Sequence, residues 1–528
     1  MNIVIGVGGT GAKVVEATIH LALMGIGPRD LKIGFVDQDE SNGNLNRARQ
    51  VFEGYISARQ SWRGDTAVHK IDGTAECPLL KTDIQPLGGE TGLWIPDSRD
   101  NATLASTFGP MGVDRHLFDA LFETGGGEET EEQKLPLENG YRGRPHVGAA
   151  VMSALADETD KFWEALVETI KSADMVGRVR IVLAGSVFGG TGAAGFPTIA
   201  RIIRQKLRDA NIERNIEVGG VLMLPYFGFP DPNDEQDQNV ARANQQLVQS
   251  RGALRHYFEL LKGPTLFDQL YLIGDFPFSM IDHHSKGSGD QRNPALFPEF
   301  LAASSTAAFF NRETPEDPLP NEVQVAARKE ARALGWHDLP AIEAGNDDAA
   351  QRKMHEAVSQ FLRFAVALKY WKTLFSTSKA RDRYHNRPWY LRQELDEVDW
   401  EGASPSTALE ALERSVDHAL RWCRMIEAYA TRDQESSFDL WRIPGTLVSP
   451  VLFEQPNQDP GVVEELSGND YQDAYEVIAR KYMRNDDDMP DDAALAEYLT
   501  EWDLEQEHAL MGRMVAALYH FSQVRHID

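Results

Sequence analysis

The stretch Ile3-Val4-Ile5-Gly6-Val7-Gly8-Gly9-Thr10-Gly11 decides the fold, because an apolar run passes directly into a glycine-rich turn. A helix is expected to begin near Ala12. Glycine lets the backbone approach a ligand closely, and the unpaired N–H groups and the dipole of a helix N-terminus favour negative charge. The stretch therefore predicts a strand, a phosphate-binding turn and a helix.

A second stretch with the same order follows later in the chain. The apolar run Arg180–Ala184 leads into Gly185-Ser186-Val187-Phe188-Gly189-Gly190-Thr191-Gly192, before an amphipathic helix expected over Phe196–Asp209. One such turn is a weak signal, whereas two indicate a di- or triphosphate held from both sides. The pair predicts a nucleotide-binding protein. The residues assigned to the phosphates are Gly8, Gly9, Thr10, Gly11, Gly189, Gly190, Thr191 and Gly192.

The bulk composition excludes several classes of protein. The 528 residues carry a formal net charge of −28 at pH 7, which argues against a general nucleic-acid or acidic-membrane surface. Cys77 and Cys423 are its two cysteines, too few for a disulfide framework. The sequence has no apolar run long enough for a membrane span, and its N-terminus lacks the basic region of a signal peptide. We expect a cytoplasmic protein that binds no nucleic acid.

The order of apolar and amphipathic segments predicts two domains. Residues 1–312 alternate strands and helices, as in an α/β domain with a mainly parallel sheet. Residues 313–528 predict a mostly α-helical domain, with apolar stripes over 354–371, 409–423 and 493–524. The strands expected in the first domain are Asn2–Ile5, Leu31–Val36, Val179–Ala184, Glu217–Leu224 and Gln269–Ile273. The helices expected there are Ala12–Met24, Gly148–Ser172, Phe196–Asp209 and Ala241–Leu261, with an irregular stretch at Trp62–Gly140.

Charged side chains near these turns are candidates for the rest of the site. Asp37 and Asp39 follow the second strand and are placed to bind Mg²⁺, which takes one or two carboxylates beside phosphates, or to contact ribose. Arg142 or Arg144, on either side of Gly143, is placed to neutralise a γ-phosphate. The sequence identifies no catalytic residue.

The first fifty residues resemble one family of enzymes. Gly6–Gly11 fits the dinucleotide-binding pattern GxGxxG, and Asp37-Gln38-Asp39 and Asn44-Leu45-Asn46-Arg47 follow it. This order resembles the ThiF-type enzymes that adenylate ubiquitin-like and sulfur-carrier proteins, and it implies an ATP-dependent adenylating activity. The sequence has neither their paired zinc cysteines nor a clear nucleophilic cysteine loop downstream, so adenylation is the alternative.

The whole predicted α/β domain resembles the FtsZ/tubulin superfamily of filament-forming GTPases, with a Rossmann-type nucleotide-binding fold. Gly6–Gly11 resembles the first phosphate loop, Gly143–Gly148 the loop facing the terminal phosphate, and Ala184–Gly192 the tubulin signature GGGTGSG. Val221–Phe227 resembles the strand leading to the ribose loop, and Asn293–Phe310 the central helix whose start contacts the base. The resemblance implies GTP or GDP with Mg²⁺, Asn293 as a base contact, and a homo-oligomer or filament.

Two departures separate the chain from that family. Ala194 stands where the signature has its last glycine, and the acidic pattern Asn-x-Asp-x-x-Asp, on which the family's hydrolysis depends, is missing after Phe310. We therefore expect a divergent prokaryotic member that assembles or switches conformation with nucleotide, with slow or partner-dependent GTP hydrolysis. A non-hydrolysing nucleotide-binding scaffold, recruiting a protein partner through its helical C-terminal domain, is a further alternative. Similarity to tubulin-like proteins of prokaryotic conflict systems adds a role in phage defence as a hypothesis.

Overall fold

A computed structural model gives the structure of the chain. It describes residues 1–63, 70–71, 75–122, 130, 132–134, 136–141, 144–156, 160–172, 177–210, 216–229, 243–276, 278–281, 291–313, 322–326, 334–335, 338–340, 354, 357–365, 368, 403–429 and 519. Contacts divide the chain into two compact units. The first unit comprises Met1–Thr18, Pro28–Arg49 and Asp83–Gly345, and the second Ile19–Gly27, Gln50–Thr82 and Asn346–Asp528. The division into residues 1–312 and 313–528 stays a prediction.

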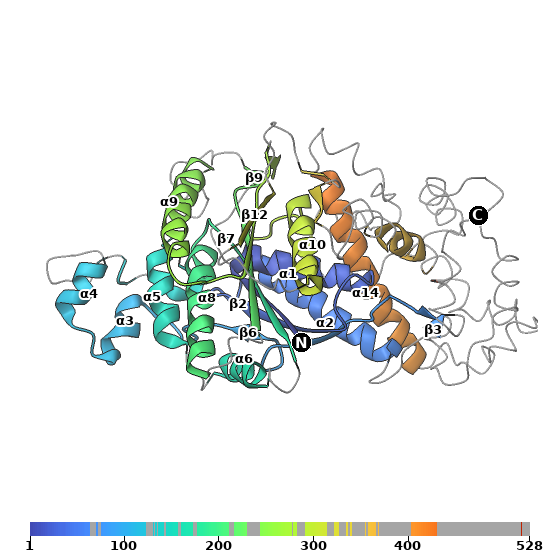
Figure 1. The fold of residues 1–528 in the computed structure, drawn as a ribbon, viewed down its shortest axis with the longest axis horizontal. Coiled ribbons are helices and arrows are strands. Elements are labelled where there is room, and N and C mark those ends of the chain that lie inside the picture. The colour runs from blue at the N-terminus through green and yellow to red at the C-terminus, as the bar shows by residue number, and fades with distance from the viewer. Residues whose placement is uncertain are drawn as a thin grey trace, which may run out of the picture. The chain divides into compact units, whose positions relative to one another are not determined.

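The first unit is built on a parallel sheet (Figure 1). Its described strands are β1 (Asn2–Val7), β2 (Asp30–Val36), β5 (Asp83–Pro86), β6 (Leu93–Trp94), β7 (Val179–Ser186), β8 (Ile216–Met223), β10 (Gln269–Ile273) and β12 (Glu322–Ala326). The order is β12-β10-β8-β7-β1-β2-β5, with β6 also paired to β2, and every one of these pairs is parallel. The predicted α/β class with a mainly parallel sheet is confirmed.

The strand order reverses between β1 and β7. From β1 the chain continues outward to β2 and β5, whereas β7, β8, β10 and β12 follow one another in the opposite direction. The two central strands are in register, with Ile5 opposite Leu183 and Gly6 opposite Ala184. The carboxyl ends of β1 and β7, each followed by a glycine turn, therefore lie side by side.

Helices cover both faces of this sheet (Figure 1). Those labelled α5, α6, α8 and α9 lie on one face, and α1 and α10 on the other. The helices of the first unit include most of α1 (Gly8–Leu23), and all of α3 (Leu104–Phe108), α4 (Arg115–Leu121), α5 (Pro145–Leu155), α6 (Lys161–Lys171), α8 (Thr191–Ala210), α9 (Ala243–Leu261) and α10 (Phe297–Asn311). Short elements there are β9 (Phe227–Gly228), β11 (Ser279–Met280) and the 3-10 turns η1 (Gly109–Met111) and η2 (Leu137–Asn139).

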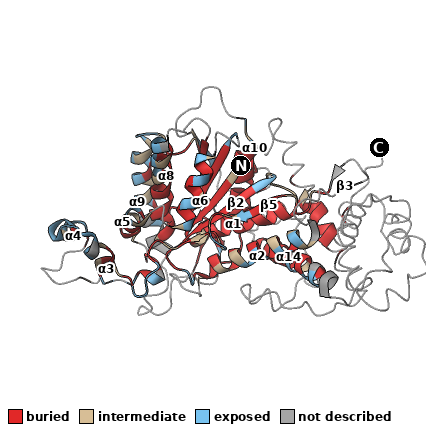
Figure 2. Ribbon diagram, turned by 90° about the horizontal axis from the view of Figure 1, so that it is seen from below, coloured by how far each residue is buried: buried red, intermediate tan, exposed pale blue. Residues whose placement is uncertain are grey.

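Burial explains why the central strands are nearly continuous apolar runs. Every residue of β7 and β8 is buried, as expected for a parallel sheet covered on both faces. Figure 2 shows that α1 and α10 are buried along most of their length as well. Arg180 and Glu217 are the charged exceptions on β7 and β8, and they pair with each other at 2.7 Å. Both charges are thereby neutralised inside the fold.

Three sequence expectations need correction. The single helix expected over Gly148–Ser172 is two helices, α5 and α6, and the side chain of Asp160 caps α6 by accepting from the Phe162 N–H at 2.8 Å. The stretch Trp62–Gly140 is not irregular throughout, because β5 and β6 extend the sheet and α3 and α4 follow them. The helices after the glycine turns begin earlier than expected, at Gly8 and Thr191, so both turns include helix N-termini.

The second unit is described in part. It contains α14 (Ala403–Ala428), most of α2 (Gly43–Arg63) and the hairpin of β3 (Lys70–Ile71) and β4 (Ala75–Glu76). The predicted stripe over 409–423 is buried on α14, and the described residues of the stripe over 354–371 are buried as well. The stripe over 493–524 lies outside the described residues except for Tyr519. None of the described helices has the length and apolarity needed to cross a bilayer.

Candidate functional site

The two glycine turns touch each other at the end of the sheet. Gly8 adopts φ +71°, a left-handed conformation that favours glycine. A Cβ on Gly8 would lie 2.9 Å from the Gly192 nitrogen and 3.5 Å from the Thr191 Cβ. The N-termini of α1 and α8 therefore converge, and both dipoles favour negative charge at the same place.

The glycines of the first turn serve two different purposes. A Cβ on Gly6 would lie 2.7 Å from the Gly11 carbonyl oxygen, and one on Gly11 would collide with the Ala184 carbonyl oxygen. Close packing between β1, α1 and β7 thus accounts for Gly6 and Gly11. Gly9 faces the loop before α2, because its Cβ would lie 2.9 Å from the Asn42 Nδ2. Gly8 is accounted for by its left-handed φ and its contact with the backbone of Gly192, so Gly9 is the position of this turn that backbone packing does not explain.

The second turn is open. Gly189 is exposed with φ +84°, and a Cβ there would meet no atom within 4 Å. Thr191 starts α8 and is buried. Its hydroxyl lies 3.8 Å from the Cβ that Gly140 would carry, and the Asp39 Cβ lies 3.7 Å from that same point. The second turn and the loop after β2 therefore meet at Gly140.

Asp37 and Asp39 are both 2 % exposed. The Asp37 Oδ1 accepts from the Asp39 N–H at 3.2 Å, and the Asp39 Oδ1 accepts from the Ser41 hydroxyl at 2.6 Å. The Thr191 hydroxyl also interacts with the Asp37 carboxylate, but the Oδ2 of Asp37 is buried with no hydrogen-bond partner in the described structure. Burial, and next the charge of Asp39, raise the pKa of Asp37 to about 7. A buried carboxylate oxygen that lacks a partner fits a cation or a sugar hydroxyl.

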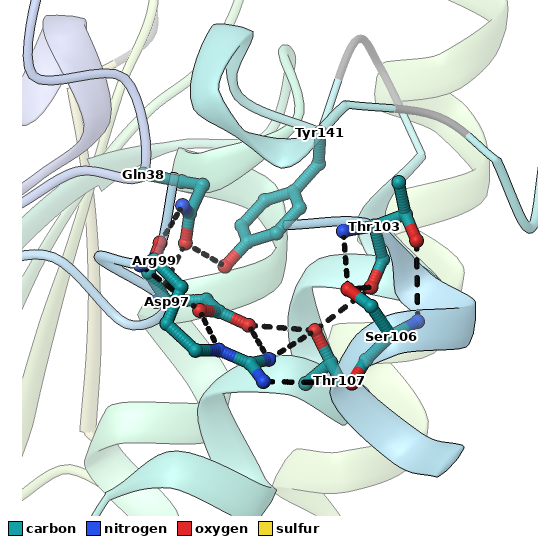
Figure 3. Close-up of polar contacts among 7 residues, drawn as sticks. All are labelled: Gln38, Asp97, Arg99, Thr103, Ser106, Thr107 and Tyr141. Atoms are coloured by element: carbon teal, nitrogen blue, oxygen red, sulfur yellow. Dashed lines mark hydrogen bonds and ion pairs between the residues drawn. The ribbon is translucent and has the colours of Figure 1, made fainter. Parts of the chain in front are cut away.

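A polar network, which the sequence did not indicate, holds Gln38, the residue between these two aspartates (Figure 3). The Gln38 Nε2 donates to the Asp97 carbonyl at 2.7 Å, and its Oε1 accepts from the Asp97 N–H at 3.0 Å and the Tyr141 hydroxyl at 3.3 Å. Burial opposes ionisation of Asp97, but hydrogen bonds from Arg99 and Thr107 outweigh it and lower its pKa. The network anchors the side chain of Gln38, the residue that lies between the two carboxylates.

Asn293 lies beside the start of α2. Its N–H donates to the Asn44 Oδ1 at 2.8 Å, and its carbonyl accepts from the Arg47 guanidinium at 2.7 Å. The Asn42 Nδ2, which faces Gly9, donates to the Gln291 Oε1 at 2.9 Å. The segment before α10 is thus bound to the start of α2, where the side chains of Asn42 and Asn44 face Gly9 of the first glycine turn.

Buried ion pairs join α1 to α2 and α10. Arg47 pairs with Glu16 at 2.8 Å, and Lys13 forms an ion pair with Glu299, which also accepts from the Tyr226 hydroxyl at 2.7 Å. All are buried. Their two positive and two negative charges cancel, so this group holds the fold together and neither cation is available to a phosphate. This packing accounts for the arginine of the Asn44–Arg47 motif.

Of the two arginines expected near a γ-phosphate, the structure describes one. Arg142 and Gly143 lie outside the described residues. Arg144 pairs with the Glu132 Oε1 at 3.3 Å, and the same oxygen lies 2.9 Å from the His146 Nε2. Arg144 is therefore already engaged by a carboxylate.

The structure thus brings Gly8, Gly9, Thr191, Asp37 and Asp39 together. In the described part of the chain, no three His, Cys, Asp or Glu side chains cluster as a metal site. Two carboxylates suffice for Mg²⁺ when phosphate oxygens and waters complete its shell. Comparison with protein-family models, with curated proteins and with solved structures finds no match for this chain.

Proposed function

We propose that the chain binds a nucleoside di- or triphosphate in the crevice between the ends of β1 and β7. The observation that carries the proposal is the contact between the two glycine turns where the strand order reverses. In open parallel sheets, ligands bind outside the carboxyl ends of the strands at this point. Two converging helix N-termini favour a polyanion over a neutral ligand.

The chain's own residues suggest a division of roles. The backbone amides of residues 8–11 and 189–192 would hold the phosphates, and the Thr191 hydroxyl would add a donor. The unpartnered Oδ2 of Asp37, with Asp39 beside it, would bind Mg²⁺, which neutralises phosphate charge. Asn293 would contact the base from the segment that is bound to the start of α2.

The nucleotide is proposed to be GTP or GDP because the order of motifs resembles the FtsZ/tubulin superfamily. In this proposal the protein switches conformation or assembles into an oligomer or filament with nucleotide. Differential contacts to the γ-phosphate would supply the free energy of the switch. The Arg144–Glu132 pair would have to open if that arginine were to meet the γ-phosphate.

Nucleotide content and binding test the proposal. The purified protein is denatured, the released nucleotide is identified by ion exchange, and GTP and ATP are titrated with Mg²⁺ by calorimetry. Thr191→Val removes the hydroxyl at the second turn, and we expect GTP to bind about tenfold more weakly, the loss of one hydrogen bond to a charged group. Thr18→Val is the matched control, because that hydroxyl donates to the Val14 carbonyl within α1.

Each other outcome points to a different function. Bound ATP, with pyrophosphate exchange in the presence of a carrier protein, would support adenylation. Failure to bind either nucleotide would leave a scaffold and refute the proposed site. If GTP binds, light scattering with GTP against GDP decides whether the protein assembles.

A further inference from the structure

A cavity of about 760 Å³ lies among α5, α8 and α9, the three helices grouped on one face of the sheet (Figure 1). Its volume is within the range of small-molecule sites. Its first wall residue on α8 is Ala193, directly after the second glycine turn, and neither aspartate of the candidate nucleotide site lines it. The cavity is therefore a separate feature of the first unit.

The wall of the cavity is mostly apolar. Its apolar lining includes Ala149 of α5, Ala194 and Pro197 of α8, and Leu260 and Leu266 at and after the end of α9. Tyr257 closes one side and uses its hydroxyl to donate to the Ala193 carbonyl at 2.6 Å. The polar end of Tyr257 is thus satisfied, and the interior suits a hydrocarbon or aromatic body.

Arginines line one side of the same cavity. Arg201, Arg204 and Arg208 are three and four residues apart and share one face of α8. Arg204 is neutralised by Asp268 at 2.9 Å, and Arg208 donates to the uncharged Gln205 at 2.9 Å. Within the described residues, Arg201 makes no ion pair or hydrogen bond. Two positive charges therefore remain at an apolar cavity, in a chain with a net charge of −28.

We propose that this cavity binds a small amphipathic anion, with an apolar body and one carboxylate. The body would occupy the space lined by Ala149, Ala194 and Leu260, and the carboxylate would pair with Arg201. Arg208 would add to the positive potential at the same side. Charge complementarity selects an anion over a neutral amphiphile, because a guanidinium binds a carboxylate by strong, directional hydrogen bonds.

Calorimetric titration with decanoate, and with decanol as the uncharged probe, tests this site. We expect decanoate to bind the wild type, and Arg201→Gln to weaken decanoate about tenfold or more while leaving decanol binding unchanged. Arg251→Gln is the matched control, because it removes the same charge from an exposed position of α9 outside the lining. Ala253→Phe places a ring in the cavity and should abolish binding of both probes.

Two results would overturn the proposal. One is no binding of decanoate to the wild type, and the other is equal loss in Arg201→Gln and Arg251→Gln. Arg201 is exposed, so Arg201→Gln remains a valid test even if Ala253→Phe fails to fold. Neither probe nor variant involves the glycine turns, so the outcome is independent of nucleotide binding.

Discussion

Replacing Asp37 with asparagine should make the stability of the protein less sensitive to pH. Burial raises the pKa of this carboxyl from 3.8 to about 7, so between these values the folded chain holds a proton that the unfolded chain has lost. The contribution of Asp37 to the free energy of unfolding is then greatest below about pH 4. It falls by about 1.4 kcal/mol per pH unit as the pH rises towards 7. Between pH 5 and pH 8 the loss is about 3 kcal/mol, and Asp37→Asn abolishes it.

Urea unfolding of the wild type and Asp37→Asn at pH 5 and pH 8, followed by circular dichroism, measures this difference. The contribution of the rest of the chain cancels when the variant is compared with the wild type at one pH, and any fixed cost of burying the amide cancels when that difference is compared between the two pH values. Asp209→Asn, on the exposed end of α8, is the control and should behave like the wild type. If the difference between wild type and Asp37→Asn is the same at both pH values, Asp37 does not ionise in a buried site and the reasoning fails.

Three more outcomes are expected. If Asp37 binds Mg²⁺ in its ionised form, the affinity for magnesium nucleotide should rise about tenfold from pH 6 to pH 8, and calorimetry at both pH values checks this. A Cβ at position 148 would lie within 3 Å of neighbouring side chains, so Gly148→Leu should lower the free energy of unfolding in urea by about 1–3 kcal/mol. Gly252→Ala, where a Cβ on α9 meets open space, should raise it slightly. Glu16→Gln leaves a buried guanidinium without its carboxylate and should cost about 3–5 kcal/mol in urea unfolding, against under about 1 kcal/mol for the exposed pair of Glu259.

The sheet and its glycine turns could be predicted from the sequence because their signals are local. An apolar run followed by glycines and an amphipathic helix lies within one continuous stretch, as at residues 3–11 and 180–192. The short strands β5, β6 and β12 gave no such signal, because two to five residues are too few to show a period. The break between α5 and α6 depended on the Asp160 cap, which the apolar pattern of both helices concealed.

The candidate site was predictable only residue by residue, not as an arrangement. Asp37 and Asp39 were identified by their position after a strand, but the support of Gln38 comes from Asp97, 59 residues later. Arg47 was identified within a motif, and its partner Glu16 lies on another helix. Such pairs follow from tertiary packing, which a single sequence does not reveal.

Hydrogen exchange measured by mass spectrometry, with and without GTP and Mg²⁺, tests the central claim most directly. The account predicts slower exchange in peptides that contain residues 8–12 and residues 189–195, because both turns donate amides to the same phosphates. Slower exchange in the loop at Asp37–Asp39 would accompany it. Protection confined to other segments, or to one turn alone, would contradict a nucleotide held between β1 and β7.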